Sequence, residues 1–432
     1  MRVMKDSGIP WIGEIPEDWV VRKLRNVGRF SASGIDKKIV EGEPLVHIIN
    51  YVDVYKNPNK ELRAQEYMIV SAPIEKCSEH QVNVGDMIFT PSSETIEDIG
   101  VSAVIMDELP NTAFSYHVLR FQPNNVVDLK YRKYFTNNNY CLNYFSSCAT
   151  GTIRKTISRD VFKECLVVLP PLAEQQRIAE FLDRKCAEVD EMIALQEQII
   201  EELKAYKQSV ITEAVTKGLN PAAPMRDSGI EWIGSIPEHW EVEQFRRLFD
   251  IKKIIANELG YDVLSVTQGG LKVKDISTNE GQMAQDYSKY QLVGIDDYVM
   301  NHMDLLTGFV DCSKQIGVTS PDYRVFKAKH KSDISLPFFL RIFQTCYKLR
   351  IFYHLGQGVA GMGRWRLPAE QLKLFLLPIP PLAEQQTIAD YLDEKCADID
   401  SLIQTKQSKI DSLKEYKKSI IYEYVTGKRE VE

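Results

Sequence analysis

The sequence predicts an α+β protein in which two mixed α/β domains are joined by two long helices, which pair as an antiparallel coiled coil under a pseudo-twofold relation. Three observations predict this arrangement. Two short blocks of sequence each occur twice, the segments between them differ, and a long stretch with helical apolar spacing follows each copy of the second block. A repeated frame with unrepeated inserts indicates two half-molecules that carry different binding modules.

The first block opens each half of the chain. Residues 4–19 read MKDSGIPWIGEIPEDW, and residues 225–240 repeat them as MRDSGIEWIGSIPEHW. The second block closes each insert, because residues 170–187 begin PPLAEQQ and residues 380–397 begin with the same seven letters. Two copies are too few for a solenoid, so the repeat predicts a pseudo-twofold protein.

Composition predicts a globular chain. With 432 residues, 44% of them hydrophobic and 26% charged, it can bury several cores. We expect it to be cytoplasmic with no membrane partner, because we find neither an apolar signal core nor an apolar stretch that could span a bilayer. The eight cysteines form no Cys-x-x-Cys pair, which argues against a disulfide framework and a thiolate zinc site. Cys186 and Cys396 recur with the repeat, and we expect both to pack in cores.

The net charge of −7 is unevenly distributed. Residues 20–168 carry 18 basic and 17 acidic side chains, and residues 241–378 carry 18 and 15. The stretches 171–218 and 381–432 carry net charges of −4 and −3. Mildly basic inserts on an acidic frame are compatible with two modules that face DNA, although many domains of similar charge do not bind it.

A long helix is predicted after each Pro-Pro pair, because proline is tolerated in the first helical turn and no further Gly or Pro follows for about 45 residues. Apolar residues recur every seven positions in both stretches, so we expect the two helices to pair. The predicted seam consists of Leu182, Val189, Gln196, Leu203, Leu392, Ile399, Lys406 and Leu413. At 1.5 Å per residue each helix makes a rod of roughly 65–70 Å, which is either a ruler or an ordinary helical hairpin.

The inserts predict the same order of elements with almost no shared sequence. Each has three short strand-like runs bounded by turns, and then a helix-like stretch before the proline pair. The predicted strands cover residues 45–52, 86–90, 101–105, 263–267, 298–300 and 323–326, and the predicted helices cover 129–145 and 338–353. Similar architecture with different residues is what two readers of different targets require.

The chain resembles the specificity (S) subunit of Type I restriction-modification systems. The resemblance covers essentially the whole sequence and rests on the SGIPWIG and IPEDW letters within residues 7–19, on the PPLAEQQ blocks at 170 and 380, and on their double alternation. It implies that the inserts are target-recognition domains, each reading one half of a bipartite, asymmetric DNA site. It also implies that the helices set the gap between the half-sites and dock two methyltransferase (M) subunits.

The resulting division has four parts. Residues 1–169 hold the N-terminal motif and target-recognition domain 1, and residues 170–218 form the central helix. Residues 219–379 hold the repeated motif and target-recognition domain 2, and residues 380–432 form the C-terminal helix. The partners implied by the resemblance are double-stranded DNA, the two M subunits and restriction (R) subunits.

The chain is expected to be non-catalytic and to need no cofactor. We find no Asn-Pro-Pro-Tyr or Asp-Pro-Pro-Tyr motif of an amino-methyltransferase, no Gly-rich cofactor loop after a strand and no Walker A loop. None of the seven histidines lies in a recognisable nucleophile or metal motif. The resemblance implies that partner subunits supply adenine methylation after base flipping and ATP-dependent cleavage.

Two pairs of loops are candidates for DNA contact. Glycines let a loop approach a backbone closely, arginine can bind a phosphate or guanine through two nitrogens, and short polar side chains suit base edges. The candidates in the first insert are Ser93, Glu94, Thr95, Thr152, Arg154 and Lys155, and those in the second are Asn301, His302, Arg364 and Arg366. Arg154 and Arg364 could instead pair with acids of their own domain, and the other candidates could belong to plain polar loops.

Aromatic residues allow two interpretations. Tyr51 and Tyr55 could face DNA, but core packing is the simpler expectation. Four tryptophans recur with the first block, and we expect them to anchor each insert to the helical frame rather than to contact DNA. They are Trp11, Trp19, Trp232 and Trp240.

Two other protein classes stay open on the sequence. A coiled-coil adaptor whose two inserted domains bind proteins fits the helices equally well, but it gives no reason for basic inserts on an acidic frame. Salt-sensitive binding to DNA would separate it from the specificity subunit. An enzyme with an unrecognised active site would need activity from the purified chain alone.

Overall fold

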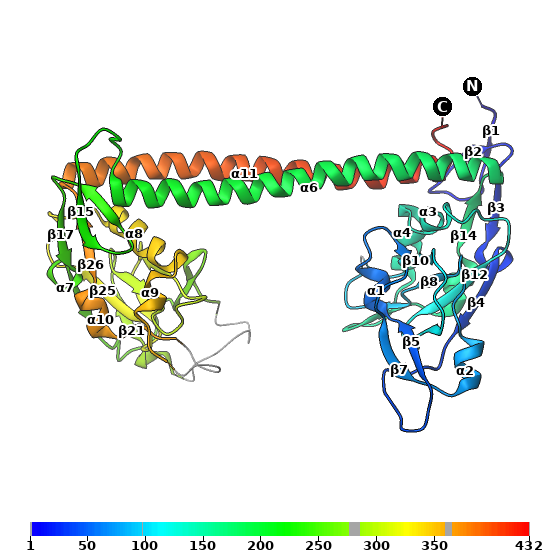
Figure 1. Ribbon diagram of the computed structural model, residues 1–432, viewed down its shortest axis with the longest axis horizontal. Coiled ribbons are helices and arrows are strands. Elements are labelled where there is room, and N and C mark those ends of the chain that lie inside the picture. The colour runs from blue at the N-terminus through cyan, green and yellow to red at the C-terminus, as the bar shows by residue number, and fades with distance from the viewer. Residues whose placement is uncertain (1, 97, 276–285, 359–364, 432) are drawn as a thin grey trace. The chain divides into compact units, whose positions relative to one another are not determined.

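The computed structural model describes residues 2–96, 98–275, 286–358 and 365–431. The chain divides into two compact units: unit 1 comprises residues 1–197 and 408–432, and unit 2 comprises residues 198–407. Each unit therefore holds one insert and one stretch of each long helix (Figure 1).

The two long helices are uninterrupted. Helix α6 (Leu172–Lys217) has 46 residues and α11 (Leu382–Val425) has 44. Helix α6 ends at Gly218, whose φ of +74° is the left-handed conformation that glycine adopts without strain. A Cβ atom at Gly218 would also lie 3.2 Å from the Trp240 ring. The end of the helix is therefore fixed by a residue that no larger side chain could replace easily.

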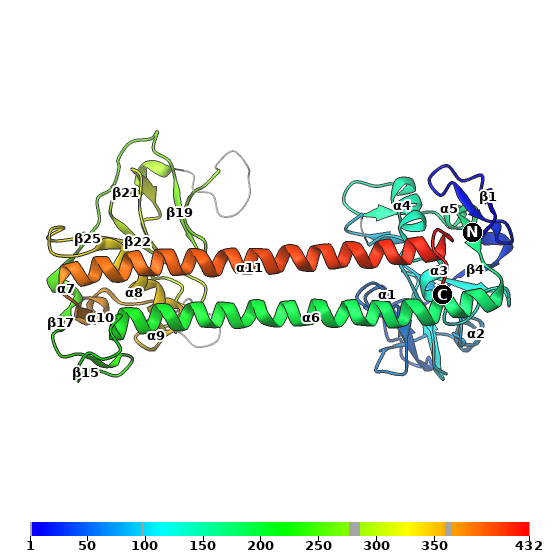
Figure 2. The same ribbon diagram turned by 90° about the horizontal axis from the view of Figure 1, so that it is seen from above.

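Both units pair α6 with α11 through the same kind of contact. In unit 1, Lys417 Nζ lies 2.6 Å from Asp190 Oδ2, and in unit 2, Lys207 Nζ lies 2.6 Å from Asp400 Oδ2. Asp190 and Asp400 are related by the repeat, as are Lys207 and Lys417. Unit 1 joins the beginning of α6 to the end of α11, and unit 2 joins the end of α6 to the beginning of α11, so the pairing is antiparallel (Figure 2).

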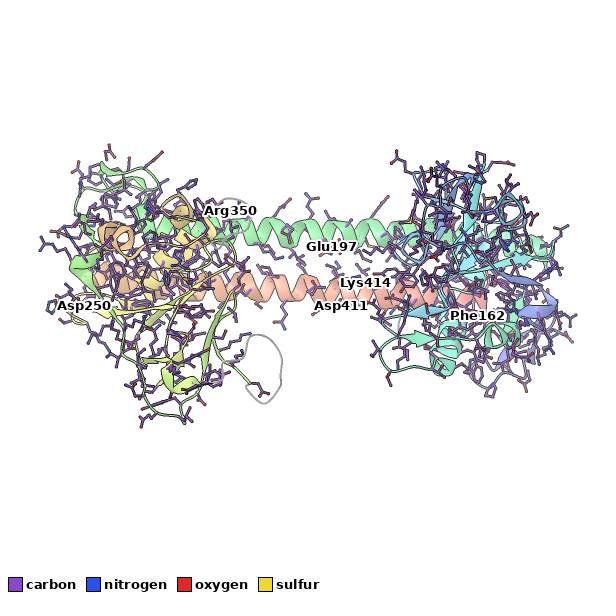
Figure 3. All side chains as sticks on the ribbon, turned by 90° about the horizontal axis from the view of Figure 1, so that it is seen from below. Phe162, Glu197, Asp250, Arg350, Asp411 and Lys414 are labelled. Carbon is purple, nitrogen blue, oxygen red and sulfur yellow. The ribbon has the colours of Figure 1, made fainter. Side chains whose placement is uncertain are left out.

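The predicted seam residues occupy a buried or half-buried stripe. Leu182, Val189, Leu392 and Ile399 are at most 2% exposed, and Gln196 is 6% exposed. The remaining seam residues, Leu203, Lys406 and Leu413, are half-buried. By contrast, Glu197, Asp411 and Lys414 of unit 1 are exposed (Figure 3).

The first insert is built on a sheet of five strands within the described residues. Its strand order is β4 (Gly28–Ala32), β12 (Leu119–Pro123), β8 (Met87–Phe89), β10 (Ser102–Ile105) and β6 (Glu61–Leu62). The other strands of unit 1 form a three-stranded sheet, β11 (Thr112–Phe114), β5 (Leu45–Ile49) and β7 (Met68–Ser71), and the pairs β1 (Met4–Asp6) with β2 (Glu14–Pro16), β13 (Lys155–Thr156) with β9 (Ser92–Ser93) and β14 (Leu166–Leu169) with β3 (Val20–Lys23). The short helices are α1 (Tyr51–Tyr55), α2 (Ile74–Glu79), α3 (Arg132–Phe135), α4 (Asn139–Cys148) and α5 (Arg159–Glu164).

The second insert repeats the central part of this sheet. Strands β18 (Phe249–Lys252), β25 (Arg324–Ala328), β22 (Tyr298–Met300) and β23 (Val310–Cys312) form four neighbouring strands in the described part of unit 2. The paired strands are β15 (Met225–Ile230) with β16 (Gly234–Pro237), β17 (Glu241–Gln244) with β26 (Leu376–Ile379), β19 (Leu264–Thr267) with β20 (Gly270–Val273) and β21 (Gln291–Val293) with β24 (Gly317–Thr319). The helices are α7 (Phe245–Leu248), α8 (Leu336–Lys348), α9 (Ile351–His354) and α10 (Ala369–Leu374).

The core of each insert continues onto its long helices. In unit 1, Phe162 packs in one cluster with Leu182 of α6 and Ile420 of α11 (Figure 3). In unit 2, Phe249 belongs to a cluster that includes Val215 of α6 and Leu392 of α11. Because apolar burial is continuous, each insert shares one hydrophobic core with its helices and is not merely connected to them by the chain.

Three predicted elements differ from the structure, one at its end and two by an internal break. The run 45–52 leaves the sheet after Ile49, because Asn50 caps α1 through a capping box with Asp53. The predicted helix 129–145 is two helices, α3 and α4, because the Asn138 side chain accepts the Cys141 N–H and starts a new helix. The predicted helix 338–353 is broken at Arg350, whose φ is +57°.

The repeated tryptophans divide into two kinds. Trp19 and Trp240 are at most 1% exposed, and the Trp19 ring N–H donates to Glu174 of α6 (2.9 Å). Trp232 is half-buried and packs against the core of unit 2. Trp11 is 57% exposed, and its backbone carbonyl accepts the hydroxyl of Tyr422 on α11 (3.0 Å).

The repeated cysteines and the apolar content of the helices were both predicted from composition. Cys186 and Cys396 are 6% and 4% exposed and pack in the two cores, as predicted. Across the described ranges, none of the helices is long and apolar enough to cross a bilayer.

Candidate nucleic-acid interface

The first glutamine of each PPLAEQQ block ties an insert to its helix. In unit 1 the backbone N–H of Asp128 donates to Gln175 Oε1 (2.8 Å), and in unit 2 the backbone N–H of Ser335 donates to Gln385 Oε1 (2.8 Å). Each glutamine also donates to the carbonyl of the first proline of its own block (2.9 Å). Both glutamines are 1% exposed, so the repeated block forms the same buried hydrogen-bonded contact between insert and helix in each unit.

An ion pair between each insert and its long helix is also repeated. Lys133 of α3 pairs with Asp183 of α6 (2.7 Å), and Arg341 of α8 pairs with Asp393 of α11 (2.7 Å). Asp183 and Asp393 are related by the repeat, although the two basic residues lie in inserts that share little sequence. The frame therefore holds two different inserts through matching contacts.

In the first insert the structure brings the two predicted loops together. Strands β9 and β13 are antiparallel, with Ser93 opposite Lys155 and Ser92 opposite Thr156. Residues 92–95 and 152–155 therefore lie side by side, and we call them the first loop cluster.

Ser93 is buried within the first loop cluster. It is 1% exposed, its hydroxyl lies 2.9 Å from the Tyr51 hydroxyl, and it accepts the Thr95 N–H. Burial raises the pKa of Tyr51, and the hydrogen bond with Ser93 opposes that rise. Glu94 and Thr95 are exposed, and the Thr95 hydroxyl donates to Asp98 (2.7 Å). The structure thus gives Ser93 a role in positioning Tyr51, and its contact with DNA remains a prediction.

The turn that precedes β13 begins with a required glycine. Gly151 has a φ of +106°, and a Cβ atom there would lie 2.1 Å from the Arg154 carbonyl oxygen. Lys155 Nζ donates to the Gly151 carbonyl (2.8 Å), which closes the turn. Thr152 and Arg154 are exposed on this turn.

Arg154 lies in a basic and aromatic environment. Burial lowers the pKa of His117, and the nearby charges of Lys37 and Arg154 lower it further. The Tyr116 and His117 rings are 3.8 Å apart, and Tyr116 is 48% exposed. Among the described residues Arg154 forms no ion pair with an acid. Exposed cations beside aromatic rings suit phosphates and bases.

In the second insert the predicted loops are also neighbours. Asn301 and His302 follow β22, and the backbone N–H of Leu367 donates to the His302 carbonyl (2.9 Å). Arg366 is exposed beside them, whereas Arg364 lies outside the described residues. We call residues 301–302 and 365–367 the second loop cluster.

Asn301 and His302 are both half-buried. The Asn301 carbonyl accepts the Tyr347 hydroxyl (2.9 Å). Burial lowers the pKa of His302 to about 3, and the charges of Arg324 and Arg366 add to this effect. His302 is therefore neutral at working pH, and it could exchange hydrogen bonds with a base edge without adding charge.

The two loop clusters occupy corresponding places. Phe89, the last residue of β8, lies opposite Leu119, and Met300, the last residue of β22, lies opposite Arg324. The residues that follow these two strands, 90–95 and 301–302, therefore leave the same edge of equivalent sheets. The repeat at the level of the fold places two different sets of polar side chains at one position of the frame.

Sequence analysis missed four residues of these surroundings: Lys37, Tyr116, His117 and Arg324. Three of them come from loops or strands distant in sequence, and no local pattern marks them. Arg324 did carry a signal, because it is a charged residue inside the otherwise apolar run of a predicted strand. In the part of the chain that is described, no group of three His, Cys, Asp or Glu side chains could hold a metal ion.

This architecture defines a class of protein: a repeated helical frame that presents two unlike, basic loop clusters. Comparisons with known proteins give the family. The model of the Type I restriction modification DNA specificity domain matches residues 16–205 and again residues 237–425. The chain belongs to this family of Type I restriction-modification specificity proteins, and it contains two copies of the domain.

Relatives agree with this assignment. The chain is 24% identical over 424 residues to the type I restriction enzyme MjaX specificity subunit of Methanocaldococcus jannaschii, covering 96% of this chain and 95% of the relative. It is 26% identical over 262 residues to the EcoBI specificity subunit of Escherichia coli, covering 57% of this chain and 55% of the relative. The protein is thus a non-catalytic specificity subunit rather than an adaptor of another class.

Solved structures share the fold. A chain from a type I R-M system superposes with a TM-score of 0.67 at 14% identity, covering 96% of this chain and 99% of that one. The HsdS subunit from Thermoanaerobacter tengcongensis gives a TM-score of 0.52 at 14% identity, covering 96% and 98%. The predicted architecture of two α/β domains and a coiled coil is confirmed.

Proposed function

We propose that each insert reads one half of a bipartite, asymmetric DNA site, with the first loop cluster reading one half-site and the second loop cluster the other. The observation that carries this proposal is a contrast: the contacts between insert and helix match in the two units, but the loops differ. The same glutamine and aspartate contacts hold both inserts, whereas the residues that leave the equivalent sheet edges differ completely. A frame of this kind presents two different readers in one fixed way.

The proposal includes the division of labour along the chain. Residues 1–169 and 219–379 hold the two target-recognition domains, and residues 170–218 and 380–432 form the helices that set the gap between half-sites. The helices also dock two methyltransferase subunits, and restriction subunits join the complex. Because the proposed target is DNA, we place the protein in the cytoplasm.

The assigned contacts follow from exposure and charge. Arg154, Thr152 and Lys155 of the first loop cluster bind the DNA backbone or a base edge, with Glu94 and Thr95 beside them. Asn301, His302 and Arg366 do so in the second loop cluster, together with Arg364 and through residues that differ from the first set. Side-chain pairing with bases depends on docking geometry, so the half-site sequences must be measured.

The test is a genome-wide map of N6-methyladenine in cells that express this chain with its neighbouring methyltransferase, beside cells that lack only this chain. We expect one asymmetric motif of two short half-sites around a fixed gap. A chimera whose second insert, residues 241–378, is replaced by that of another specificity subunit should change one half-site only. The proposal fails if a soluble complex gives no new motif, or if the chimera changes both half-sites.

The helices can be tested with the same map. Four extra residues at matched positions in α6 and α11 lengthen the pair by roughly 6 Å, which should widen the gap by one or two base pairs. A chain with four residues replaced rather than added at those positions is the control. An active insertion variant with an unchanged gap contradicts the role of the helices as a spacer.

A further inference from the structure

Arg324 is a buried cation without a counter-charge in the described part of unit 2. Its side chain is 8% exposed. Nη2 donates to the Leu367 carbonyl (3.1 Å), and Nη1 is buried without any hydrogen-bond partner. Burial lowers the pKa of Arg324 to about 10, and no carboxylate opposes that effect. The guanidinium remains charged at neutral pH, so the free protein holds a desolvated charge that it does not neutralise.

The first insert shows how the same fold satisfies a buried arginine. Arg120 of β12 is 6% exposed, and its guanidinium donates to the Gln81 carbonyl (2.7 Å) and the Ser31 hydroxyl (3.0 Å). Asp86 lies 3.8 Å from it as a counter-charge. The register position equivalent to Arg324 is occupied in the first insert by the apolar Leu119. The fold therefore does not need a cation at this position.

A second unsatisfied polar atom lies beside Arg324. His302 Nδ1 is buried without a partner, and the charge of Arg324 contributes to the lowered pKa of this histidine. Leu367 joins the two residues, because its carbonyl accepts from Arg324 and its N–H donates to the His302 carbonyl. Buried donors and acceptors without partners are rare in folded proteins, and two at one place are what a binding site without its ligand presents.

A cavity adjoins this place. It has a volume of about 440 Å³, and its lining includes Asn301 and Tyr323, the chain neighbours of His302 and Arg324. The exposed Arg366 of the second loop cluster is the chain neighbour of Leu367 and forms an isolated β-bridge with Gln357. Arg324 and His302 do not line this cavity themselves, but each is one residue along the chain from a residue that does.

We propose that Arg324 and His302 form the specificity-determining site of the second insert, and that they bind electronegative acceptor atoms of DNA. This inference rests on the proposed function. The acceptors are either the O6 and N7 atoms of a guanine or the oxygens of a phosphate, both of which suit a guanidinium with a free nitrogen. His302, which is neutral, supplies the second hydrogen bond. The two sources have different consequences for sequence preference, so one experiment distinguishes them.

The experiment compares the wild-type chain with Arg324→Met and His302→Asn, each in complex with its methyltransferase. The probes are the motif found for the wild type and a set of duplexes with each base of the second half-site changed. Lys327→Met is the matched control, because Lys327 is an exposed cation on the same strand, β25. Thermal unfolding of each free chain is measured alongside binding.

If the acceptor is guanine, both variants lose discrimination at one position of the second half-site, by roughly tenfold to a hundredfold. Replacing the N7 atom of that guanine by carbon should weaken wild-type binding but not that of Arg324→Met. If the acceptor is a phosphate, binding weakens equally for all sequences and the salt dependence becomes shallower by about one ion. Lys327→Met should leave the motif unchanged in either case.

The stability measurement separates this role from a structural one. A buried charge without a counter-ion destabilises the free chain, so Arg324→Met should unfold at the same or a higher temperature than the wild type. Unchanged DNA binding and motif in both variants, or a lower unfolding temperature with unchanged binding, overturns the inference. If Arg324→Met does not fold, His302→Asn decides by the same criteria. A wild-type complex without any motif would instead refute the proposed function itself.

Discussion

Arg120 in the first insert and Arg324 in the second are buried on corresponding strands, yet only one of them is neutralised by the protein. Arg120 faces Asp86 and three hydrogen-bond acceptors, whereas Arg324 has a single backbone carbonyl. The contacts of the frame differ much less, since Gln175 and Gln385 share two hydrogen bonds and Gln175 adds one to the Val126 carbonyl. The comparison indicates that the repeat preserves the mounting of the inserts, while the polar interior of each insert is free to change with its target.

The largest predicted effect is the loss of Arg120. Arg120→Met leaves Asp86 buried without its counter-charge, so we expect the free energy of unfolding of the first insert to fall by about 3–5 kcal/mol. Denaturant unfolding, followed by spectroscopic probes placed in each insert, measures this change.

Arg324→Met is the counterpart that makes this prediction specific. The same chemical change in the second insert should cause no loss of stability, because it removes a charge that has no partner. Equal destabilisation by the two substitutions would show that the two arginines have the same structural role, and the comparison would fail.

The next prediction concerns the repeated glutamine contact between each insert and its long helix. Gln175→Leu and Gln385→Leu each leave one buried backbone N–H and one proline carbonyl without a partner. We expect each to lower the free energy of unfolding by about 2 kcal/mol, with the larger loss for Gln175, which also donates to the Val126 carbonyl. Gln176→Leu, at an exposed neighbouring position, is the control. A tenfold smaller effect in one unit than in the other would contradict an equivalent mounting.

Much of the frame could be predicted from sequence because its signals are local and repeated. The absence of Gly and Pro after residue 171 and residue 381 predicts the two long helices, and the heptad spacing predicts their buried stripe. Three strands of each insert were also indicated, but other strands of the two sheets, among them β4, β12, β18 and β23, were not predicted. The helix breaks were not, because the caps at Asn138 and the left-handed Arg350 depend on single side chains and on packing nearby.

The candidate site was only partly predictable. Glycine spacing and exposed arginines indicated the loops around Arg154 and Arg366, and the structure brings each of these loops beside the other predicted loop of its insert. The burial of Ser93 and its contact with Tyr51 could not be predicted, because they depend on pairing between strands distant in sequence. The lack of a counter-charge for Arg324 is likewise a property of three-dimensional packing, which no residue pattern reports.

A smaller effect should appear in the pH dependence of stability. The pKa of His302 is about 3 in the fold, below its ordinary value of about 6.5, so the unfolded chain takes up a proton first as the pH falls. The contribution of His302 to stability is therefore complete above pH 6.5 and is lost progressively as the pH falls toward 3. We expect a loss of about 1–2 kcal/mol between pH 6.5 and pH 5, measured by denaturant unfolding.

The variant His302→Asn isolates this contribution. The pKa values of His80 and His117 in the first insert are also lowered, so the wild type has several sources of acid sensitivity. Only the difference between the wild-type and His302→Asn curves reports the second loop cluster. If the two curves are parallel between pH 6.5 and pH 5, His302 is not held in a desolvated, cationic environment.

The smallest predicted effect tests the symmetry of the frame directly. Reversing one charge of a helix pair, by Asp190→Lys in unit 1 or Asp400→Lys in unit 2, should cost about 0.5–1 kcal/mol, because these ion pairs are partly exposed. Adding Lys417→Asp or Lys207→Asp, respectively, should recover most of the loss in each unit. A double-mutant cycle by thermal unfolding measures both coupling energies, and equal values are expected because the repeat relates the two pairs. Unequal coupling would mean that the difference between the inserts extends into the helices, and that the frame does not hold the two inserts equivalently.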